Sequence, residues 1–261
     1  MLLKEVVKMR KIAVILNKGG VGKTTTAVNL AHGLSLQNKK VLLVDTDDQG
    51  QCCKLLNAFP KYGLANVLDD DSPIDPLKAC EEVRENLYLL RGGEELAIVK
   101  KMLSMKEMRS ELSLLDVLSN IEGKFDYVVL DTSPSFDSLS LNVLFYCEEI
   151  LTPVSLESLS LDSLASFGRR VVSVSKYNTK LKHKYLVPTF QDGRVKKSKE
   201  VLAILEKHFS DVICDPINYS SKVSESAGHG KTIFEFAHNS TGAEDYKKLV
   251  KRIVRDEREY A

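Results

Sequence analysis

Residues 12–26 of this 261-residue chain read IAVILNKGGVGKTTT, an apolar run followed directly by a glycine-rich segment. The apolar run predicts a buried strand over 12–16, and the pattern after it predicts a helix over 24–37. Glycines between the two let the backbone curl so that successive N–H groups point inward, and the helix adds the positive end of its dipole. Polyphosphate is the ligand that fits this arrangement.

Two side chains of this segment have the chemistry to hold phosphates. Lys23 would reach the β- and γ-phosphates, and the Thr24 hydroxyl would take one coordination position of Mg²⁺. The general pattern G-x-x-x-x-G-K-[ST] requires glycine at position 17, where this chain has asparagine. The strand before the loop and the helix after it favour a nucleotide site over a glycine-rich turn with incidental lysines.

The rest of the chain alternates short apolar runs with longer amphipathic stretches. Further strands are expected at 41–45, 87–90, 127–131, 150–154 and 185–188, with a weak one near 212–214. Helices are expected at 95–105, 110–121, 139–147, 158–177, 198–209 and 242–255. This order is typical of βαβ units, and strands that are apolar on both faces are covered by helices on both sides.

We therefore expect an α/β fold with a doubly wound, mostly parallel twisted sheet flanked by helices, as in P-loop NTPases. Residues 10–261 are expected to form a single ATPase domain after a short N-terminal extension over 1–9, without an N-terminal helix-turn-helix module. Composition agrees with a globular chain, because 43% of the residues are hydrophobic and 28% are charged. No apolar run approaches the roughly 20 residues of a membrane helix.

The five cysteines show no framework spacing, which favours a reduced, cytosolic compartment. Cys52 and Cys53 are adjacent, too close together to clamp a metal by themselves. We interpret both as small packing residues.

Carboxylates end two of the predicted strands, Asp45 after 41–44 and Asp131 after 127–130. A buried carboxylate is costly unless it faces a cation or hydrogen-bond donors. The carboxyl ends of the strands of an open α/β sheet form the crevice where ligands bind. Asp131 therefore fits a carboxylate that bonds a water of Mg²⁺, and helix capping is the alternative for either residue.

Residues 18–25, KGGVGKTT, resemble the deviant Walker A box KGGxGK[ST] of the ParA/MinD superfamily of ATPases, and Asn17 fits the ParA-like branch. The resemblance implies ATP and Mg²⁺ as cofactors. It also implies that Lys18 crosses a dimer interface to the partner's nucleotide, where a second cation would act as an arginine finger does. The implied nucleotide contacts in this loop are Lys18, Gly19, Gly20, Val21, Gly22, Lys23, Thr24 and Thr25, with Lys18 and Lys23 also catalytic.

Residues 45–50, DTDDQG, resemble the Walker A′ box D-x-D-P-Q-G of the same family. This implies that Asp45 helps to hold Mg²⁺ together with Thr24 and Asp131, and that Asp47 is the catalytic residue that orients the attacking water. Asp48 stands where the family commonly has proline, which adds a negative charge beside the site. Residues 131–135, DTSPS, are similar to D-[TC]-P-P-S, with Ser133 in place of the first proline.

The resemblance covers nearly the whole chain. Residues 216–218, PIN, are similar to a P-R-N segment near the nucleotide base, so Pro216 and Asn218 are expected base contacts although the arginine is missing. Residues 222–231, KVSESAGHGK, resemble R-L-S-E-A-P-S-F-G-K of chromosomal ParA proteins.

Residues 169–199 contain ten Lys and Arg against one acid, Asp192, although the whole chain has 37 basic and 36 acidic residues. Phosphate backbones are natural partners for such a segment, and a solvated basic face is the alternative. In ParA-like proteins the ATP-bound dimer binds DNA without sequence preference through this region. The resemblance implies DNA contacts at Arg194, Lys196, Lys197, Lys199 and Lys222.

These features predict a partition ATPase of DNA segregation, cytoplasmic and associated with the nucleoid. ATP would favour a sandwich homodimer on nonspecific double-stranded DNA, and hydrolysis stimulated by a ParB-like protein would release it to position a chromosome, plasmid or cargo. Two alternatives stay open, a MinD-like membrane-cycling ATPase and a biosynthetic P-loop ligase of the dethiobiotin or cobyrinic acid class. The apolar stripe of 242–255 is expected to dock on the domain, so a membrane partner is disfavoured.

Overall fold

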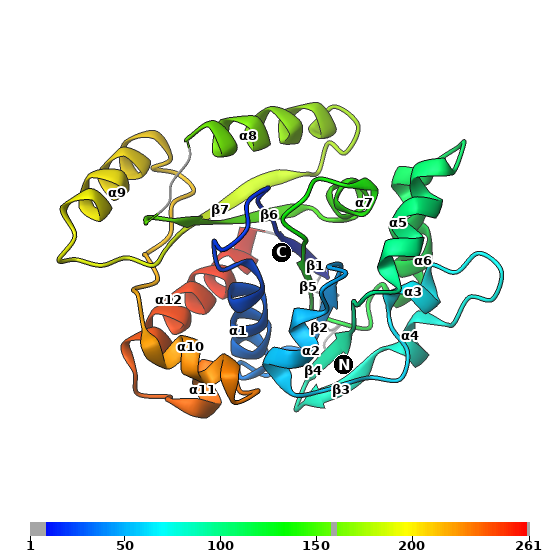
Figure 1. Cartoon of the computed structure of the whole chain (residues 1–261), viewed down its shortest axis with the longest axis horizontal. Coiled ribbons are helices and arrows are strands. Elements are labelled where there is room, and N and C mark those ends of the chain that lie inside the picture. The colour runs from blue at the N-terminus through cyan, green and yellow to red at the C-terminus, as the bar shows by residue number, and fades with distance from the viewer. Residues whose placement is uncertain (1–8, 158–160, 260–261) are drawn as a thin grey trace, which may run out of the picture.

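A seven-stranded sheet with the order β3-β4-β2-β5-β1-β6-β7 runs through the computed structural model, which describes residues 9–157 and 161–259 (Figure 1). Parallel pairing joins all neighbouring strands except β3 and β4, which are antiparallel. The strands are β1 (Arg10–Val14), β2 (Val41–Asp45), β3 (Glu81–Arg84), β4 (Leu87–Leu90), β5 (Tyr127–Asp131), β6 (Glu149–Ser155) and β7 (Lys182–Thr189).

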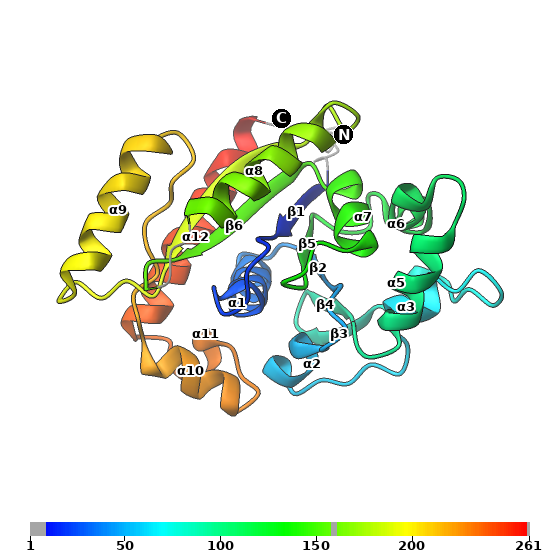
Figure 2. The same cartoon turned by 45° about the horizontal axis from the view of Figure 1, so that its top comes forward.

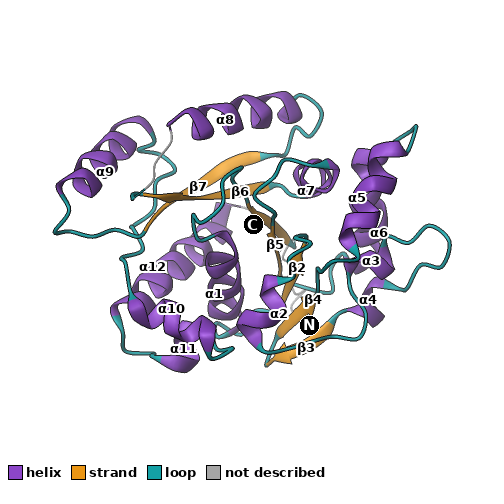
Figure 3. Ribbon diagram, viewed as in Figure 1, coloured by secondary structure: helices purple, strands orange, loops and turns teal. Residues whose placement is uncertain are grey.

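Helices pack on both faces of this sheet and divide the core in two (Figures 1 and 3). One face is covered by α1 (Lys23–Ser35), α2 (Gln51–Leu56), α10 (Ser221–Gly228), α11 (Ile233–Phe236) and α12 (Thr241–Arg255). The other is covered by α3 (Leu64–Val67), α4 (Pro76–Ala79), α5 (Leu96–Met105), α6 (Ser113–Leu118), α7 (Ser138–Tyr146), α8 (Leu161–Ser175) and α9 (Lys196–His208). The predicted doubly wound, mostly parallel architecture is confirmed.

Three predicted strands, at 41–45, 87–90 and 127–131, have the predicted bounds. The weak strand near 212–214 was wrong, because it contributes only an isolated bridge from Ile213 to Leu186. The helix expected over 110–121 is broken into α6 and two flanking 3₁₀ turns, η1 (Ser110–Leu112) and η2 (Ser119–Ile121). Of the helix expected over 158–177, residues 158–160 lie outside the described residues.

The antiparallel edge strand β3 was missed, and its sequence explains why. Its residues read EEVR and are exposed or half-buried, so the apolar run that marks the inner strands is lacking. Charged side chains of this kind are common on edge strands, because they discourage pairing with another chain.

Arg10, at the start of β1, ties the amino end of the sheet to α12. Its guanidinium donates to both carboxylate oxygens of Glu149 at 2.7 and 2.6 Å, and to the Tyr185 hydroxyl at 2.8 Å. A further bond at 2.5 Å reaches the carbonyl of Ile253 in α12. Arg10 and Glu149 are 3% and 1% exposed. Because breaking a buried ion pair leaves an uncompensated charge, this contact fixes where α12 docks.

The apolar stripe of α12 lies against the sheet and α1, as the sequence predicted. Tyr246, Leu249, Val250 and Ile253 are all buried in the core on this face. In the part of the chain that the structure describes, no helix combines the length and apolarity needed to cross a membrane.

Candidate nucleotide site

The loop between β1 and α1 has the backbone that the glycine-rich segment predicts. Gly20 and Gly22 adopt left-handed conformations with φ of 71° and 85°, which side chains with a Cβ rarely adopt. Gly22 caps the N-terminus of α1, and the Lys23 ammonium donates to the carbonyl of Lys18 at 2.7 Å. The loop thus closes on the amine of Lys23 at the positive end of the α1 dipole.

A cavity of about 330 Å³ lies on this loop and reaches the end of β2. Most of the predicted loop residues line it together with Asp47, namely Gly19, Gly20, Gly22, Lys23, Thr24 and Thr25. Lys18 and Val21 are outside this lining, and the Val21 side chain is buried in the core. Four lining residues that the sequence did not single out are Gln51, Leu55, Thr132 and Pro134. One cavity therefore joins the phosphate loop to Asp47.

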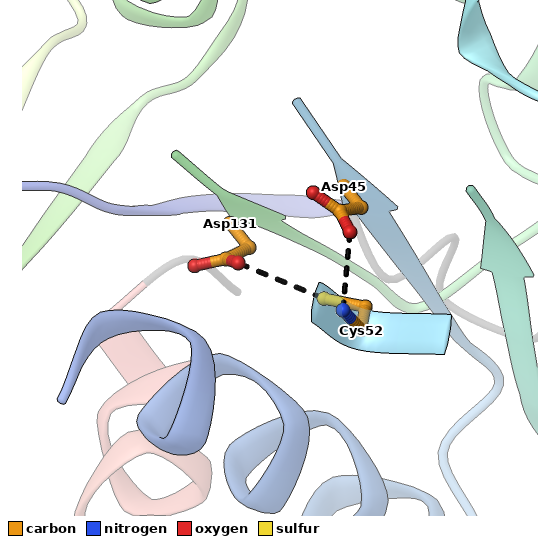
Figure 4. A group of neighbouring side chains, drawn as sticks. All are labelled: Asp45, Cys52 and Asp131. Carbon is orange, nitrogen blue, oxygen red and sulfur yellow. Dashed lines mark hydrogen bonds between the residues drawn. The ribbon is translucent and has the colours of Figure 1, made fainter. Parts of the chain in front are cut away.

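Asp45 and Asp131 lie side by side because they are register partners at the ends of β2 and β5. Both side chains are fully buried. Asp45 accepts from the backbone N–H groups of Asp47 at 2.9 Å and Cys52 at 3.1 Å, whereas Asp131 Oδ2 accepts from the Cys52 thiol at 3.7 Å (Figure 4). Asp131 Oδ1 is buried and has no hydrogen-bond partner among the described residues.

Burial beside one another disfavours the charged forms of these two carboxylates. Burial raises the pKa of Asp45 to about 6 and that of Asp131 well above its usual range. The charge of Asp45 raises the pKa of Asp131 further, while Thr24 and Lys23 oppose the shift. Burial likewise lowers the pKa of Lys23 although Asp131 and Asp47 act to raise it.

A divalent cation fits these residues. Hard cations such as Mg²⁺ take oxygen ligands, and the bare Oδ1 of buried Asp131 is an oxygen without a partner among the described residues. A cation would also relieve the repulsion between the two carboxylates.

Asp47 is held in place by the loop that follows β4. Its carbonyl accepts from the N–H groups of Gly50 at 3.2 Å and Gly93 at 3.1 Å. A Cβ on Gly92 would lie 2.5 Å from that carbonyl oxygen and 2.9 Å from Cγ of Asp45, so only glycine fits there. Gly92 is a site residue that the sequence reasoning missed, and the Gly-Gly pair after the strand at 87–90 was the available signal.

Lys100 of α5 is a second residue near the site that the sequence did not predict. Its ammonium lies 3.3 Å from Asp48 and 2.9 Å from Asp137, the residue that caps α7. Burial alone would raise the pKa of Asp48, but the charge of Lys100 and the side-chain hydrogen bonds with Gln49, Asp47 and Lys100 together hold that pKa below its usual range. The Ser133 hydroxyl bonds Ser135 and Asp137 within the second loop. Both departures from the family pattern, Asp48 and Ser133, thus belong to one network.

The expected base contacts are only partly brought to the site. Asn218 lines a cavity of about 30 Å³ beside Gly22, together with Phe190, Tyr219 and Tyr246. It donates to Asp245 through its backbone N–H at 3.0 Å and its side-chain amide at 2.8 Å. Pro216 is half-buried and is not among the residues that line this cavity.

The five predicted DNA contacts lie on neighbouring segments, with Arg194 just before α9, Lys196, Lys197 and Lys199 in α9, and Lys222 in α10. All five are exposed. A bridge between Gln191 and Asn218 joins the chain segments that lead into the two helices. Figures 1 and 2 show α9 and α10 toward the same end of the molecule.

Three of these cations have an acidic neighbour on their own segment. Arg194 lies 2.8 Å from Asp192, Lys196 3.6 Å from Glu200, and Lys222 2.7 Å from Glu225. Within residues 9–157 and 161–259, no ion pair is recorded for Lys197 or Lys199. Exposed pairs are weak and can exchange for a phosphate.

Comparison with known proteins agrees with this geometry. A protein-family model described as AAA domain matches residues 9–183. The chromosome-partitioning ATPase Soj of Thermus thermophilus is 32% identical over 249 residues, which cover 95% of this chain and 96% of Soj.

Two solved structures are similar in fold and sequence. The cobyrinic acid a,c-diamide synthase of Mycobacterium smegmatis, with bound ADP and magnesium, is 29% identical with a TM-score of 0.82, covering 95% of both chains. A putative plasmid partition protein of Borrelia burgdorferi bound to AMPPNP is 25% identical with a TM-score of 0.81, covering 95% of this chain and 100% of the other.

A phosphate loop between the first strand and first helix, with buried carboxylates at the ends of neighbouring parallel strands, defines a P-loop ATPase. Within that class, the chain belongs to the AAA-domain family matched above, in the group of the Soj/ParA partition ATPases. The resemblance expected from the deviant Walker A box is confirmed.

Proposed function

We propose that this chain is an ATP-hydrolysing partition protein whose single domain, residues 10–261, binds Mg²⁺-ATP in the cavity on the phosphate loop. The observation that carries the proposal is the convergence of Lys23, Thr24 and Asp47 on one cavity, beside a buried carboxylate, Asp131, whose Oδ1 has no hydrogen-bond partner in the part of the chain that the structure describes. The ADP- and AMPPNP-bound neighbours support this choice of ligand.

Each residue has a role that follows from its position. The loop N–H groups and Lys23 bind the β- and γ-phosphates, and Thr24 and Asp131 hold Mg²⁺, which neutralises phosphate charge when it is bound. Asp45 lies beside Asp131 at the metal, and it also fixes the loop after β2 by accepting two of the backbone N–H groups of that loop. Asp47, held by Gly50 and Gly93, orients the attacking water.

Lys18 is proposed to act in a homodimer. It is half-buried, and its backbone carbonyl accepts from the Lys23 ammonium, so Lys18 lies directly beside the phosphate-binding lysine. In a nucleotide-sandwich dimer, Lys18 would contact the phosphates bound by the partner and supply charge as an arginine finger does.

The partners that we propose are nonspecific double-stranded DNA, as on the nucleoid of the cytoplasm, and a ParB-like protein that stimulates hydrolysis. Support comes from the exposed cations of α9 and α10 and from the similarity to a chromosome-partitioning ATPase. The cations would contact backbone phosphates, which hold a protein on the duplex without carrying sequence information.

Binding to unrelated duplex DNA at two salt concentrations, with and without ATP, tests this function. Wild type should bind only with ATP, Lys23→Ala should not bind, and Asp47→Ala should remain bound because it cannot hydrolyse. Lys197→Ala and Lys199→Ala should each lower the log–log salt slope by about 0.9. Lys207→Ala, exposed on the last turn of the same helix, is the matched control and should match wild type.

The similarity to the Mycobacterium smegmatis synthase keeps a biosynthetic ligase as the second candidate. A ligase would bind ATP in the same cavity but would show DNA binding that is absent or independent of ATP. That outcome, together with ATP consumption that needs a small carboxylic acid, would contradict the partition function and leave the nucleotide site intact.

A further inference from the structure

We propose that the metal centre of this chain also binds a thiophilic divalent cation, Zn²⁺, with Cys52 as a ligand beside Asp131 and Asp45. The proposal rests on the placement of the two carboxylates in the proposed nucleotide site. It does not depend on DNA binding or on a partner protein.

The three side chains converge from separate elements, β2, α2 and β5 (Figure 4). One donor atom of each lies within 4.8 Å of the other two, and all three residues are buried. The Cys52 sulfur is 3.7 Å from Asp131 Oδ2. Zinc bonds of about 2.3 Å to sulfur and about 2.0 Å to oxygen, at a tetrahedral angle, separate those atoms by about 3.5 Å. The sulfur and oxygen thus already have nearly the spacing that zinc requires.

The other oxygen of the Asp131 carboxylate gives a second reason to place a cation against this residue. Oδ1 is buried and unpartnered among the described residues, in a carboxylate whose other oxygen contacts the thiol. A buried acceptor without a donor is unfavourable, and a metal ion bound to Oδ1 would remove that cost.

The thiol determines which metal is favoured. Mg²⁺ prefers oxygen ligands and gains nothing from sulfur, whereas Zn²⁺ takes thiolate and carboxylate together. On binding, the S–H bond of Cys52 breaks, its proton passes to solvent, and a zinc–sulfur bond forms. Three protein ligands leave one tetrahedral position for water or a phosphate oxygen. Zn²⁺ in this place would exclude the Mg²⁺ that ATP requires.

Cobalt titration of the nucleotide-free, reduced full chain tests the proposal, because a cobalt–thiolate bond gives a charge-transfer absorption band in the near ultraviolet. We expect the band in wild type, and we expect added Zn²⁺ to remove it. Cys53→Ala is the matched control and should keep the band, since Cys53 is the neighbouring buried cysteine outside this group.

Cys52→Ser keeps a hydroxyl that can donate to Asp131, so its fold is preserved while sulfur is lost. It should show no charge-transfer band. It should also bind Zn²⁺ at least about tenfold more weakly than wild type, because losing even a residue that only hydrogen-bonds to a metal ligand weakens metal binding by about tenfold or more. Zn²⁺ should also raise the melting temperature of wild type and Cys53→Ala more than that of Cys52→Ser.

A band that persists in Cys52→Ser, or its absence in wild type, would overturn the proposal. Either result leaves the proposed function standing, provided that the same protein still binds Mg²⁺-ATP. If wild type shows the cobalt band but does not bind Mg²⁺-ATP, the proposed function is contradicted and the zinc site is not.

Discussion

The ammonium group of Lys100 lies 3.3 Å from a carboxylate oxygen of Asp48. It thereby offsets the negative charge that this chain carries where the family pattern has proline. The same ammonium lies 2.9 Å from Asp137, which caps α7 and accepts from Ser133. One side chain of α5 therefore connects the loop after β2 with the loop after β5, and both loops contribute residues to the cavity on the phosphate loop.

Lys100→Met should release both loops. The Lys100 side chain is 12% exposed, and its loss leaves two carboxylates that are only partly solvated. We expect a decrease of about 1–2 kcal/mol in the free energy of unfolding, and about a tenfold decrease in ATP turnover as Asp47 loses its position. Urea unfolding and a phosphate-release assay measure the two effects. Lys101→Met, exposed on the same helix, should change neither, and equal losses in both variants would show that Lys100 has no special role.

Gly92→Ala should impair hydrolysis without touching the phosphate loop. The new methyl group would lie 2.5 Å from the Asp47 carbonyl oxygen, so the loop after β2 must shift. We expect kcat to fall by about a hundredfold with a much smaller change in nucleotide affinity. Gly168→Ala, where a Cβ meets no atom within 4 Å, is the control. Unchanged kcat in Gly92→Ala would show that the position of Asp47 does not limit the reaction.

The pair Arg10 and Glu149 should show strong coupling in a double-mutant cycle. Either Arg10→Met or Glu149→Leu leaves one buried charge without its partner and should cost about 3–5 kcal/mol of unfolding free energy. The double variant should cost less than the sum, because neither charge then remains. Additive losses in chemical denaturation would mean that the two residues stabilise the fold independently.

His183 should make stability depend on pH. It lines an apolar cavity of about 560 Å³ between α8 and α9, where His208 is the other titratable lining residue. Burial lowers the pKa of His183 to about 4, whereas an unfolded histidine titrates near 6.5. Protons therefore bind preferentially to the unfolded chain as the pH falls from about 6.5 to about 4, and stability decreases over that window.

The size of this effect can be isolated by substitution. Between pH 7 and pH 5, wild type should lose about 1–2 kcal/mol more unfolding free energy than His183→Leu. Denaturant titrations at both pH values give the difference. If wild type and His183→Leu lose the same unfolding free energy between the two pH values, the low pKa of buried His183 is contradicted.

The parts of the fold that the sequence predicted are those in which local pattern and burial agree. β2 and β5 are continuous apolar runs that end in aspartate, and both have the predicted bounds. The phosphate loop was recognisable because its glycines and Lys23 are consecutive in the chain. Patterns of this kind predict the structure well, because each depends on residues within a single strand, turn or helix.

Contacts between distant segments could not be predicted in the same way. Lys100 reaches Asp48 across 52 positions, and Cys52 reaches Asp131 across 79. Cys52 was expected to be a small packing residue, and it is buried, but its thiol also donates to the buried carboxylate of Asp131. The order of the strands and the packing of α2 and α5 on the sheet together determine which of these side chains meet.

The pairing of Asp45 with Asp131 along β2 and β5 has a consequence for the whole sheet. A slip of one residue between these strands would turn one carboxylate to the opposite face, and a slip of two would move it about 6.6 Å along the strand. The backbone ladder from Val41 to Asp45 therefore sets the spacing of the two charges. A substitution at the far end of either strand can therefore change the affinity of the proposed metal site while every proposed ligand remains in place.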